Sequence, residues 1–143
     1  MPPVPDEPCV CSQLRRTARL VSLFYDQALE STGLSVTQYA LLARIGRANG
    51  LSQTALAAQL GMDRTTLTRN LGPLERQGLI ENQAGTDRRE KLLTLTEEGI
   101  KRASQAKPHW QEAQHRMIKH LGKERWHHLR ELLTISEEVL ESI

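Results

Sequence analysis

Most of the chain has apolar residues at intervals of three and four, the spacing that places them on one face of an α-helix. The first such stretch starts at Ser12 and is expected to stop at Gly33, because glycine is typical of helix C-termini. Later stretches begin after the capping residues Ser52, Asp63 and Thr96. The pattern therefore predicts further helices over residues 37–48, 53–60, 64–76, 97–121 (bent near Pro108) and 123–142.

The spacing of the apolar residues changes between the helices predicted over 64–76 and 97–121. Residues 79–83 and 91–96 are short segments of alternating or β-prone residues, and a polar turn over 84–90 separates them. This arrangement predicts a β-hairpin with a long tip. The expected fold class is therefore mainly α with one small β-hairpin.

Composition limits the classes of protein to consider. With 143 residues, 38% of them hydrophobic and 25% charged, the chain suits one ordinary globular domain. It has two cysteines, no secretory signal, and no apolar run near the roughly 20 residues that cross a bilayer, so a cytoplasmic protein without a membrane partner is expected. Four prolines within residues 1–10 predict a flexible N-terminal arm. The few aromatic residues disfavour stacking on single-stranded nucleic acid.

The stretch over residues 53–71 predicts a helix-turn-helix. Ala57 is small enough for two helices to cross closely, and Gly61 suits the corner between them. Apolar residues at 56, 60, 62, 67 and 71 face the shared core, which leaves the opposite face of the second helix to Arg64, Thr65, Thr68 and Arg69. Guanidinium and hydroxyl groups match phosphate oxygens and base edges in the major groove of DNA. The alternative is a helical hairpin with a solvated polar face.

The predicted hairpin adds a second feature of DNA-binding proteins. Its tip carries Arg88 and Arg89, and a narrow minor groove beside a docked helix attracts inserted arginines. Asp87 can hold one guanidinium in a fixed direction and is the expected brace of this wing. The alternative is an ordinary turn with solvated charges.

The run LSQTALAAQLGMDRTTLTRNLGPLERQGLI and the later run GTDRREKLLTLTEEG resemble the winged helix-turn-helix of the MarR family, the multiple-antibiotic-resistance-type regulators. The resemblance extends over nearly the whole chain. It implies a winged helix-turn-helix over 37–99, flanked by helical dimerisation regions over 11–36 and 100–143 within a single domain. The implied function is a homodimeric transcriptional regulator, with repression expected, that binds a pseudo-palindromic operator in double-stranded DNA. Gly72-Pro73 departs from the pattern and is expected to interrupt the recognition helix.

Under that resemblance, each protomer places its recognition helix in a major groove and its wing in the adjacent minor groove. The two half-sites are expected about one helical turn, roughly 34–36 Å, apart. Further phosphate contacts are expected from Ser52, Thr54 and Thr66. The dimer interface is expected on the apolar seams of the first and last helices, at Leu14, Val21, Trp126, Leu129, Leu133 and Leu140.

Two kinds of signal are compatible with the resemblance. Cys11 falls at the position of the peroxide-reactive cysteine in organic-hydroperoxide regulators of this family, with Cys9 as a candidate resolving partner and Tyr25 as one of the tyrosines that lower the thiol pKa. The alternative is that both cysteines are only structural. The other family option is a pocket for a small aromatic or phenolic effector, with candidate lining residues Arg16, Phe24, Tyr39 and Trp110. The histidines lack the spacing of a zinc site, so no metal and no cofactor is expected.

Two other classes of protein compete with a DNA-binding regulator. A winged-helix-shaped protein-interaction adaptor that does not bind DNA would be expected to replace the polar face and the wing arginines, and they are intact. An enzyme would need a base near Cys11, a phosphate-binding glycine loop or a pair of carboxylates, none of which the sequence offers. A regulator is therefore the leading prediction, the adaptor is the alternative, and no enzymatic activity is expected.

Overall fold

The structure is a computed structural model that describes residues 8–84 and 91–143. Its helices are α1 (Val10–Leu29), the 3₁₀ helix η1 (Glu30–Thr32), α2 (Val36–Ala48), α3 (Gln53–Leu60), α4 (Arg64–Arg76), α5 (Glu97–Leu121) and α6 (Lys123–Glu141). Its strands are β1 (Leu51–Ser52), β2 (Ile80–Ala84) and β3 (Lys91–Leu95), which form one antiparallel sheet in the order β1-β3-β2. None of these helices is long and apolar enough to span a membrane. The expected fold class is confirmed.

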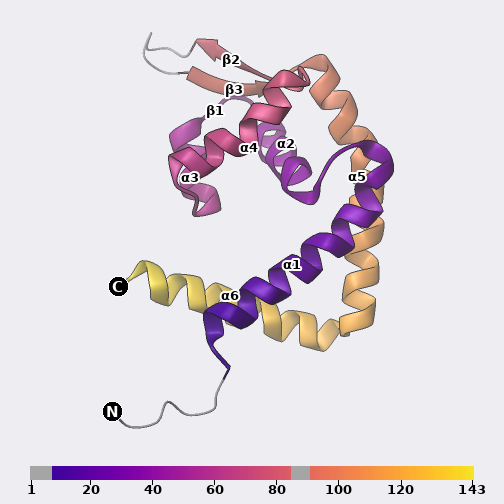
Figure 1. Cartoon of the computed structure of the whole chain (residues 1–143), viewed down its shortest axis with the longest axis vertical. Helices are drawn as coiled ribbons and strands as arrows, with labels where there is room; N and C mark the ends of the chain where they lie inside the picture. Colours follow the sequence, from indigo (N-terminus) through magenta and orange to yellow (C-terminus); the bar gives the residue numbers. More distant parts are fainter. Residues whose placement is uncertain (1–7, 85–90) are drawn as a thin grey trace.

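The elements form two groups joined by α5 (Figure 1). One group contains α2, α3, α4 and the sheet, and we call it the head. The other contains α1, α6 and the C-terminal part of α5. In Figure 1 α5 runs away from the sheet and changes direction along its length, and Pro108 lies inside this helix.

The hydrophobic core lies mainly in the head. Helical periodicity places one face of α2 and one face of α4 against each other and against the sheet. The largest fully buried side chains are Leu29, Leu41, Leu42, Ile45, Leu56, Leu67, Leu71, Leu74, Leu79 and Leu93. By contrast, α6 has no buried residue. The head is therefore packed within the protomer, whereas α6 leaves its apolar side chains partly exposed.

The first turn of α5 is fixed directly against the residues that follow α4. The backbone N–H of Thr96 donates to the carbonyl of Leu79 at 3.1 Å, and the hydroxyl of Thr96 donates to the carbonyl of Gly78 at 2.5 Å. Gly99 packs so closely here that a β-carbon added to it would lie 1.9 Å from the carbonyl oxygen of Leu79. We call this contact the α5 joint, because it ties the long helix to the head.

Three local features differ from the sequence-based expectations. Helix α1 begins at Val10, inside the segment expected to be an extended arm. Strand β1 was not predicted, because two residues are too short to show an alternating pattern. The expected interruption of α4 at Pro73 was wrong, since α4 continues to Arg76. Burial of the neighbouring Leu71 and Leu74 in the core keeps the chain helical although Pro73 lacks an N–H donor.

Candidate nucleic-acid interface

A tight turn holds α3 and α4 in a defined crossing. Gly61 ends α3 with φ of 61°, a left-handed conformation that glycine adopts without steric cost. The backbone N–H of Met62 then donates to the carbonyl of Ala57 at 3.0 Å. The corner predicted from Ala57 and Gly61 is therefore present, and it fixes the direction in which α4 starts.

Asp63 caps the start of α4. Its Oδ1 accepts the backbone N–H of Thr66 at 2.8 Å, and its Oδ2 accepts the hydroxyl of Thr66 at 3.0 Å. These two bonds, the backbone one foremost, hold the pKa of the Asp63 carboxyl below its ordinary value. The carboxylate therefore remains charged at neutral pH, next to the positive end of the helix dipole. The Thr66 hydroxyl, expected to contact phosphate, is already used within the protein.

The outer face of α4 is the centre of the candidate interface. Because α4 buries Leu67, Leu71 and Leu74 in the core, its opposite side is turned to solvent. Four exposed side chains on that side line a shared hollow of about 470 Å³: Arg64, Thr65, Thr68 and Arg69. We call these four residues the α4 polar face. The structure thus brings together the set of residues that the sequence placed on this face.

Ser52 and Thr54 lie at the start of α3. The Ser52 side chain accepts the backbone N–H of Ala55 at 3.1 Å and so acts as the N-cap of α3. Thr54 is exposed on the first turn. Both residues are placed near a helix N-terminus, where backbone N–H groups and the helix dipole favour anions such as phosphate.

The hairpin predicted from the sequence is formed by β2 and β3, in a register from Ile80 opposite Leu95 to Ala84 opposite Lys91. Asp87, Arg88 and Arg89 lie outside the described residues. Strand β1 adds a feature that sequence reasoning missed, because Ser52 pairs with Leu92 of β3 and also caps α3. The base of the hairpin is therefore joined directly to the helix-turn-helix.

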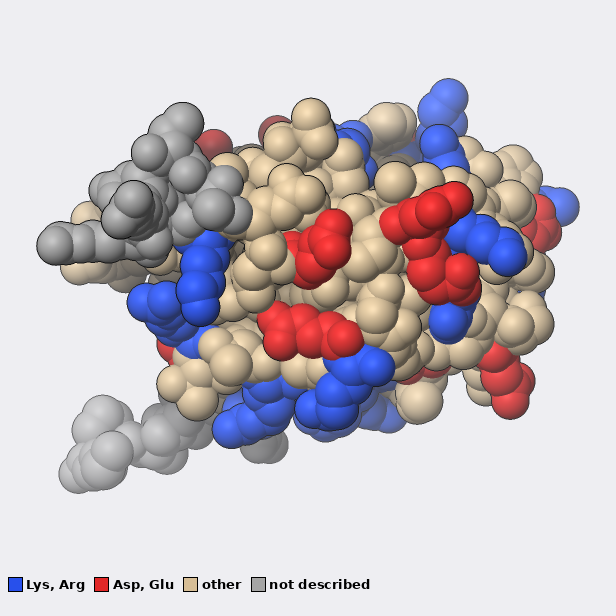
Figure 2. Space-filling view, turned by 90° about the horizontal axis from the view of Figure 1, so that it is seen from above, with Lys and Arg blue, Asp and Glu red and all other residues tan. Residues whose placement is uncertain are grey.

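Charges of both signs are mixed on the face of the molecule that Figure 2 shows. Figure 2, which views the molecule from above, shows Lys and Arg side chains beside Asp and Glu side chains. The formal net charge of the chain is only +2. Affinity for a polyanion must therefore come from the placement of individual arginines and backbone amides more than from the overall field.

Comparison with known proteins decides the family. A model of the MarR family matches residues 32–90. The M. tuberculosis transcriptional regulator MosR, whose crystal structure was solved in complex with DNA, has 36% sequence identity to this chain. The two structures align with a TM-score of 0.83 over 94% of this chain and 98% of the MosR chain. The chain belongs to the MarR family.

Other matches agree. The S. aureus MepR–DNA complex is 25% identical with a TM-score of 0.78, over 96% of this chain and 100% of that chain. The uncharacterized HTH-type transcriptional regulator YwoH of Bacillus subtilis is 31% identical over 90 residues, which are 63% of this chain and 66% of YwoH. The transcriptional activatory protein BadR of Rhodopseudomonas palustris is 34% identical over 91 residues, 61% of this chain and 52% of BadR. The chain thus spans about half to two thirds of these two curated relatives. All these relatives are regulators, not enzymes, and this chain is a MarR-family transcriptional regulator.

The cysteines of this MarR-family protein lie at the start of α1, and both are exposed. Cys9 is the N-cap residue, and the backbone N–H of Ser12, followed by the Ser12 side chain, lowers the pKa of the Cys9 thiol. Tyr25 is on the same helix as Cys11 but about 21 Å further along its axis. Its hydroxyl donates a hydrogen bond to Gln114 of α5. Within one protomer, Tyr25 therefore does not reach either cysteine.

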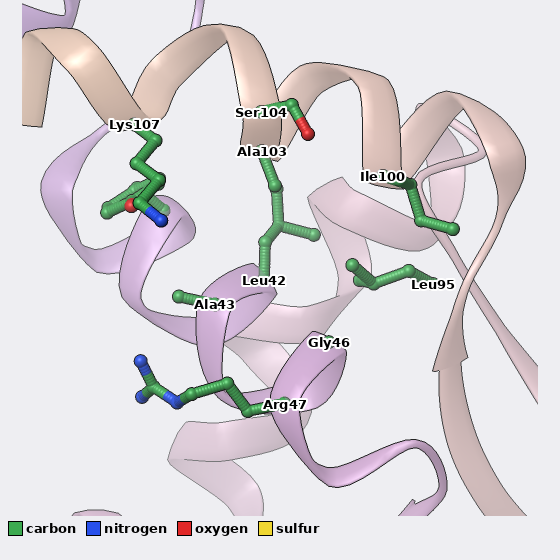
Figure 3. A pocket seen from close by; sticks show the side chains of 10 residues that line it. Leu42, Ala43, Gly46, Arg47, Leu95, Ile100, Ala103, Ser104 and Lys107 are labelled. Carbon is green, nitrogen blue, oxygen red and sulfur yellow. The ribbon is translucent and has the colours of Figure 1, made fainter.

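A pocket of about 470 Å³ lies between α2, β3 and α5 (Figure 3). Lys107 and Arg47 lie at one end of it, and the apolar side chains of Leu95 and Ile100 lie at the other. Of the four lining residues expected from the sequence, only Tyr39 lines this pocket. The other three lie elsewhere: Trp110 packs on Tyr39 with ring centroids 5.9 Å apart, Phe24 lies under the guanidinium of Arg116, and Arg16 is exposed on α1.

A second hollow, of about 300 Å³, lies between α1, α5 and α6. Its lining is almost entirely apolar. Five of the six residues expected at the dimer interface line it: Leu14, Val21, Trp126, Leu129 and Leu133. We call it the α1–α6 groove. The sixth residue, Leu140, is outside the groove and 69% exposed.

Proposed function

We propose that this regulator is a homodimer that binds a pseudo-palindromic operator in double-stranded DNA. The α4 polar face carries the proposal, because two guanidiniums and two threonines are exposed on a helix whose other side is fixed in the core. Two proteins similar to this chain, MosR and MepR, have been solved in complex with DNA. In this arrangement α4 enters the major groove, Ser52 and Thr54 face phosphates, and Arg88 and Arg89, braced by Asp87, reach the adjacent minor groove.

The dimer is proposed from the apolar surface that α1 and α6 leave uncovered. The exposed large apolar side chains of α6 are Leu129, Leu132, Leu133, Ile135, Val139 and Leu140. Monomeric proteins rarely expose a contiguous apolar patch of this kind. A second copy related by a two-fold axis would cover it and would present two α4 helices to half-sites roughly 34–36 Å apart.

Binding to DNA is tested by titrating the protein into a fluorescent duplex in the presence of excess nonspecific competitor DNA. The duplex is taken from the region upstream of the gene that encodes the protein. We expect competitor-resistant binding that Arg64→Ala and Arg69→Ala each weaken by about 1–3 kcal/mol. Lys119→Ala is the matched control, because Lys119 is exposed near the end of α5 that lies away from the head, and it should bind like the wild type.

Failure of the protein to retain any of a library of randomised duplexes over competitor would contradict the proposal. The adaptor that does not bind DNA would then be the better account of the fold.

We further propose that a small aromatic or phenolic acid, or oxidation of Cys9 and Cys11, lowers affinity for the operator. The pocket in Figure 3 supports the first route, because Lys107 and Arg47 suit a carboxylate while Leu95 and Ile100 suit an apolar ring. The lowered pKa of Cys9 supports the second route, because the thiolate is the form that peroxides oxidise. Both routes act through elements that lie outside the α4 polar face.

Displacement of the labelled duplex tests both routes in one assay. An aromatic carboxylate is expected to release DNA from the wild type but not from Lys107→Glu, whose negative charge repels the ligand. Lys101→Glu is the control, because Lys101 is exposed on the same helix but does not line the pocket.

An organic hydroperoxide is expected to release DNA from the wild type but not from Cys9→Ser or Cys11→Ser. Unchanged DNA binding under both treatments would contradict the modulation and leave the DNA proposal standing.

A further inference from the structure

Thr68 is an exposed threonine whose hydroxyl is already engaged within α4. Its Oγ1 donates to the backbone carbonyl of Arg64, one turn earlier in α4, at 2.9 Å. This bond uses the only hydrogen of the hydroxyl group and turns the oxygen back towards the helix. The residue itself is exposed. The γ-methyl is therefore the branch of the side chain that α4 offers to a partner.

The surroundings of Thr68 give this methyl group a defined place. Residues three and four apart are neighbours on a helix, so Thr65 and Thr68 lie at the centre of the α4 polar face. Arg64 and Arg69 lie at its two ends, about 7.5 Å apart along the helix axis. All four line the same hollow. An apolar contact at the centre is thus flanked by two groups that bind guanine edges or phosphates.

Thymine is the base that presents a methyl group in the major groove, at C5. We infer that Thr68 determines specificity for a thymine in each operator half-site through contact between its γ-methyl and the 5-methyl of that base. This inference rests on the proposed function of binding double-stranded DNA. It goes further because it assigns a side chain and a base, and because it predicts that the hydroxyl of Thr68 contributes no base contact.

The experiment uses the duplex that the wild type selects from its upstream region or from a randomised library. Each thymine of a half-site is replaced in turn by deoxyuridine, which removes the 5-methyl group and leaves the pairing edge unchanged. At one position per half-site we expect affinity to fall about fourfold, the effect of one methyl group removed from an apolar contact. Replacement in both half-sites is expected to lower affinity about fifteenfold.

Two variants separate the methyl from the hydroxyl. Thr68→Ser keeps the hydroxyl and loses the γ-methyl, so it should bind the thymine and deoxyuridine duplexes equally at that position. Thr68→Val keeps a methyl and loses the hydroxyl, so it should retain the full preference for thymine. Thr65→Ser makes the same chemical change in the neighbouring threonine and should also retain the preference. Circular dichroism melting of each variant shows that its fold is intact.

The outcomes distinguish this inference from the proposed function. A protein that retains no duplex over competitor overturns both. A protein that binds its operator but responds to deoxyuridine at no position overturns the inference alone. A thymine preference that survives in Thr68→Ser, or that is lost in Thr65→Ser instead, also overturns it, because another side chain then contacts the methyl group.

Discussion

Replacement of Leu133 by aspartate is expected to give a monomer that no longer retains an operator duplex. Leu133 lines the α1–α6 groove and is 37% exposed in the single protomer, and in the proposed dimer the partner completes its burial. A carboxylate buried in such an apolar contact without a partner costs several kcal/mol. The two-fold axis repeats that cost in the second protomer, so the dissociation constant of the dimer should rise by at least about a thousandfold.

Sedimentation equilibrium measures the dimer, and the duplex titration measures the effect on DNA binding. Thr134→Asp is the control, because it adds the same charge at the next position of α6, on the side that carries His127, Arg130 and Glu131. It should remain dimeric and bind DNA. A Leu133→Asp protein that sediments as a dimer would show that the interface lies elsewhere.

Gly99→Ala is expected to cause a large loss of stability. The new β-carbon would lie 1.9 Å from the carbonyl oxygen of Leu79, a backbone atom that cannot turn away as a side chain can. Relief requires α5 to move away from Leu79, which breaks the bonds from Thr96 to Gly78 and Leu79. We expect the free energy of unfolding to fall by about 3 kcal/mol, because forced overpacking in a core has costs of this size. The melting temperature should fall by about 10 °C.

Lys101→Ala is the control for this effect, because Lys101 is exposed on the same helix. Alanine favours a helix at least as much as lysine does, so Lys101→Ala should melt at the same temperature as the wild type or higher. A Gly99→Ala protein that melts within 2 °C of the wild type, roughly the shift caused by 0.5 kcal/mol, would contradict the tight packing of the α5 joint.

The starts of α3, α4 and α5 could be predicted from the sequence because capping is local. Ser52, Asp63 and Thr96 each accept a backbone N–H from three residues further on, so each signal lies within one helical turn. Strand β1 could not be predicted, because Leu51 becomes part of a strand only through its pairing with Leu93. The continuity of α4 through Pro73 depends likewise on burial of Leu71 and Leu74, which is a tertiary effect.

In the candidate site, too, the sequence predicts the features that depend on one helix and does not predict those that depend on tertiary packing. The α4 polar face was predictable, because one helix periodicity sets both its buried side and its exposed side. The lining of the pocket was not, because it depends on how α2 and α5 cross, and Phe24 and Arg16 lie elsewhere. The engagement of the Thr66 hydroxyl by Asp63 and of the Thr68 hydroxyl by Arg64 also depends on side-chain conformations, which residue types alone do not determine.

The α5 joint also determines how far α4 moves when α5 tilts. Because α5 is 25 residues long, its path is about 37 Å, and the head is attached rigidly at one end of it. A tilt of about 5° at the other end would therefore displace α4 by about 3 Å. One base-pair step of DNA is about 3.4 Å along the axis. In the proposed dimer, a rotation this small between the protomers would move one α4 out of register with its half-site while the other stays in place, with every contact inside the head preserved.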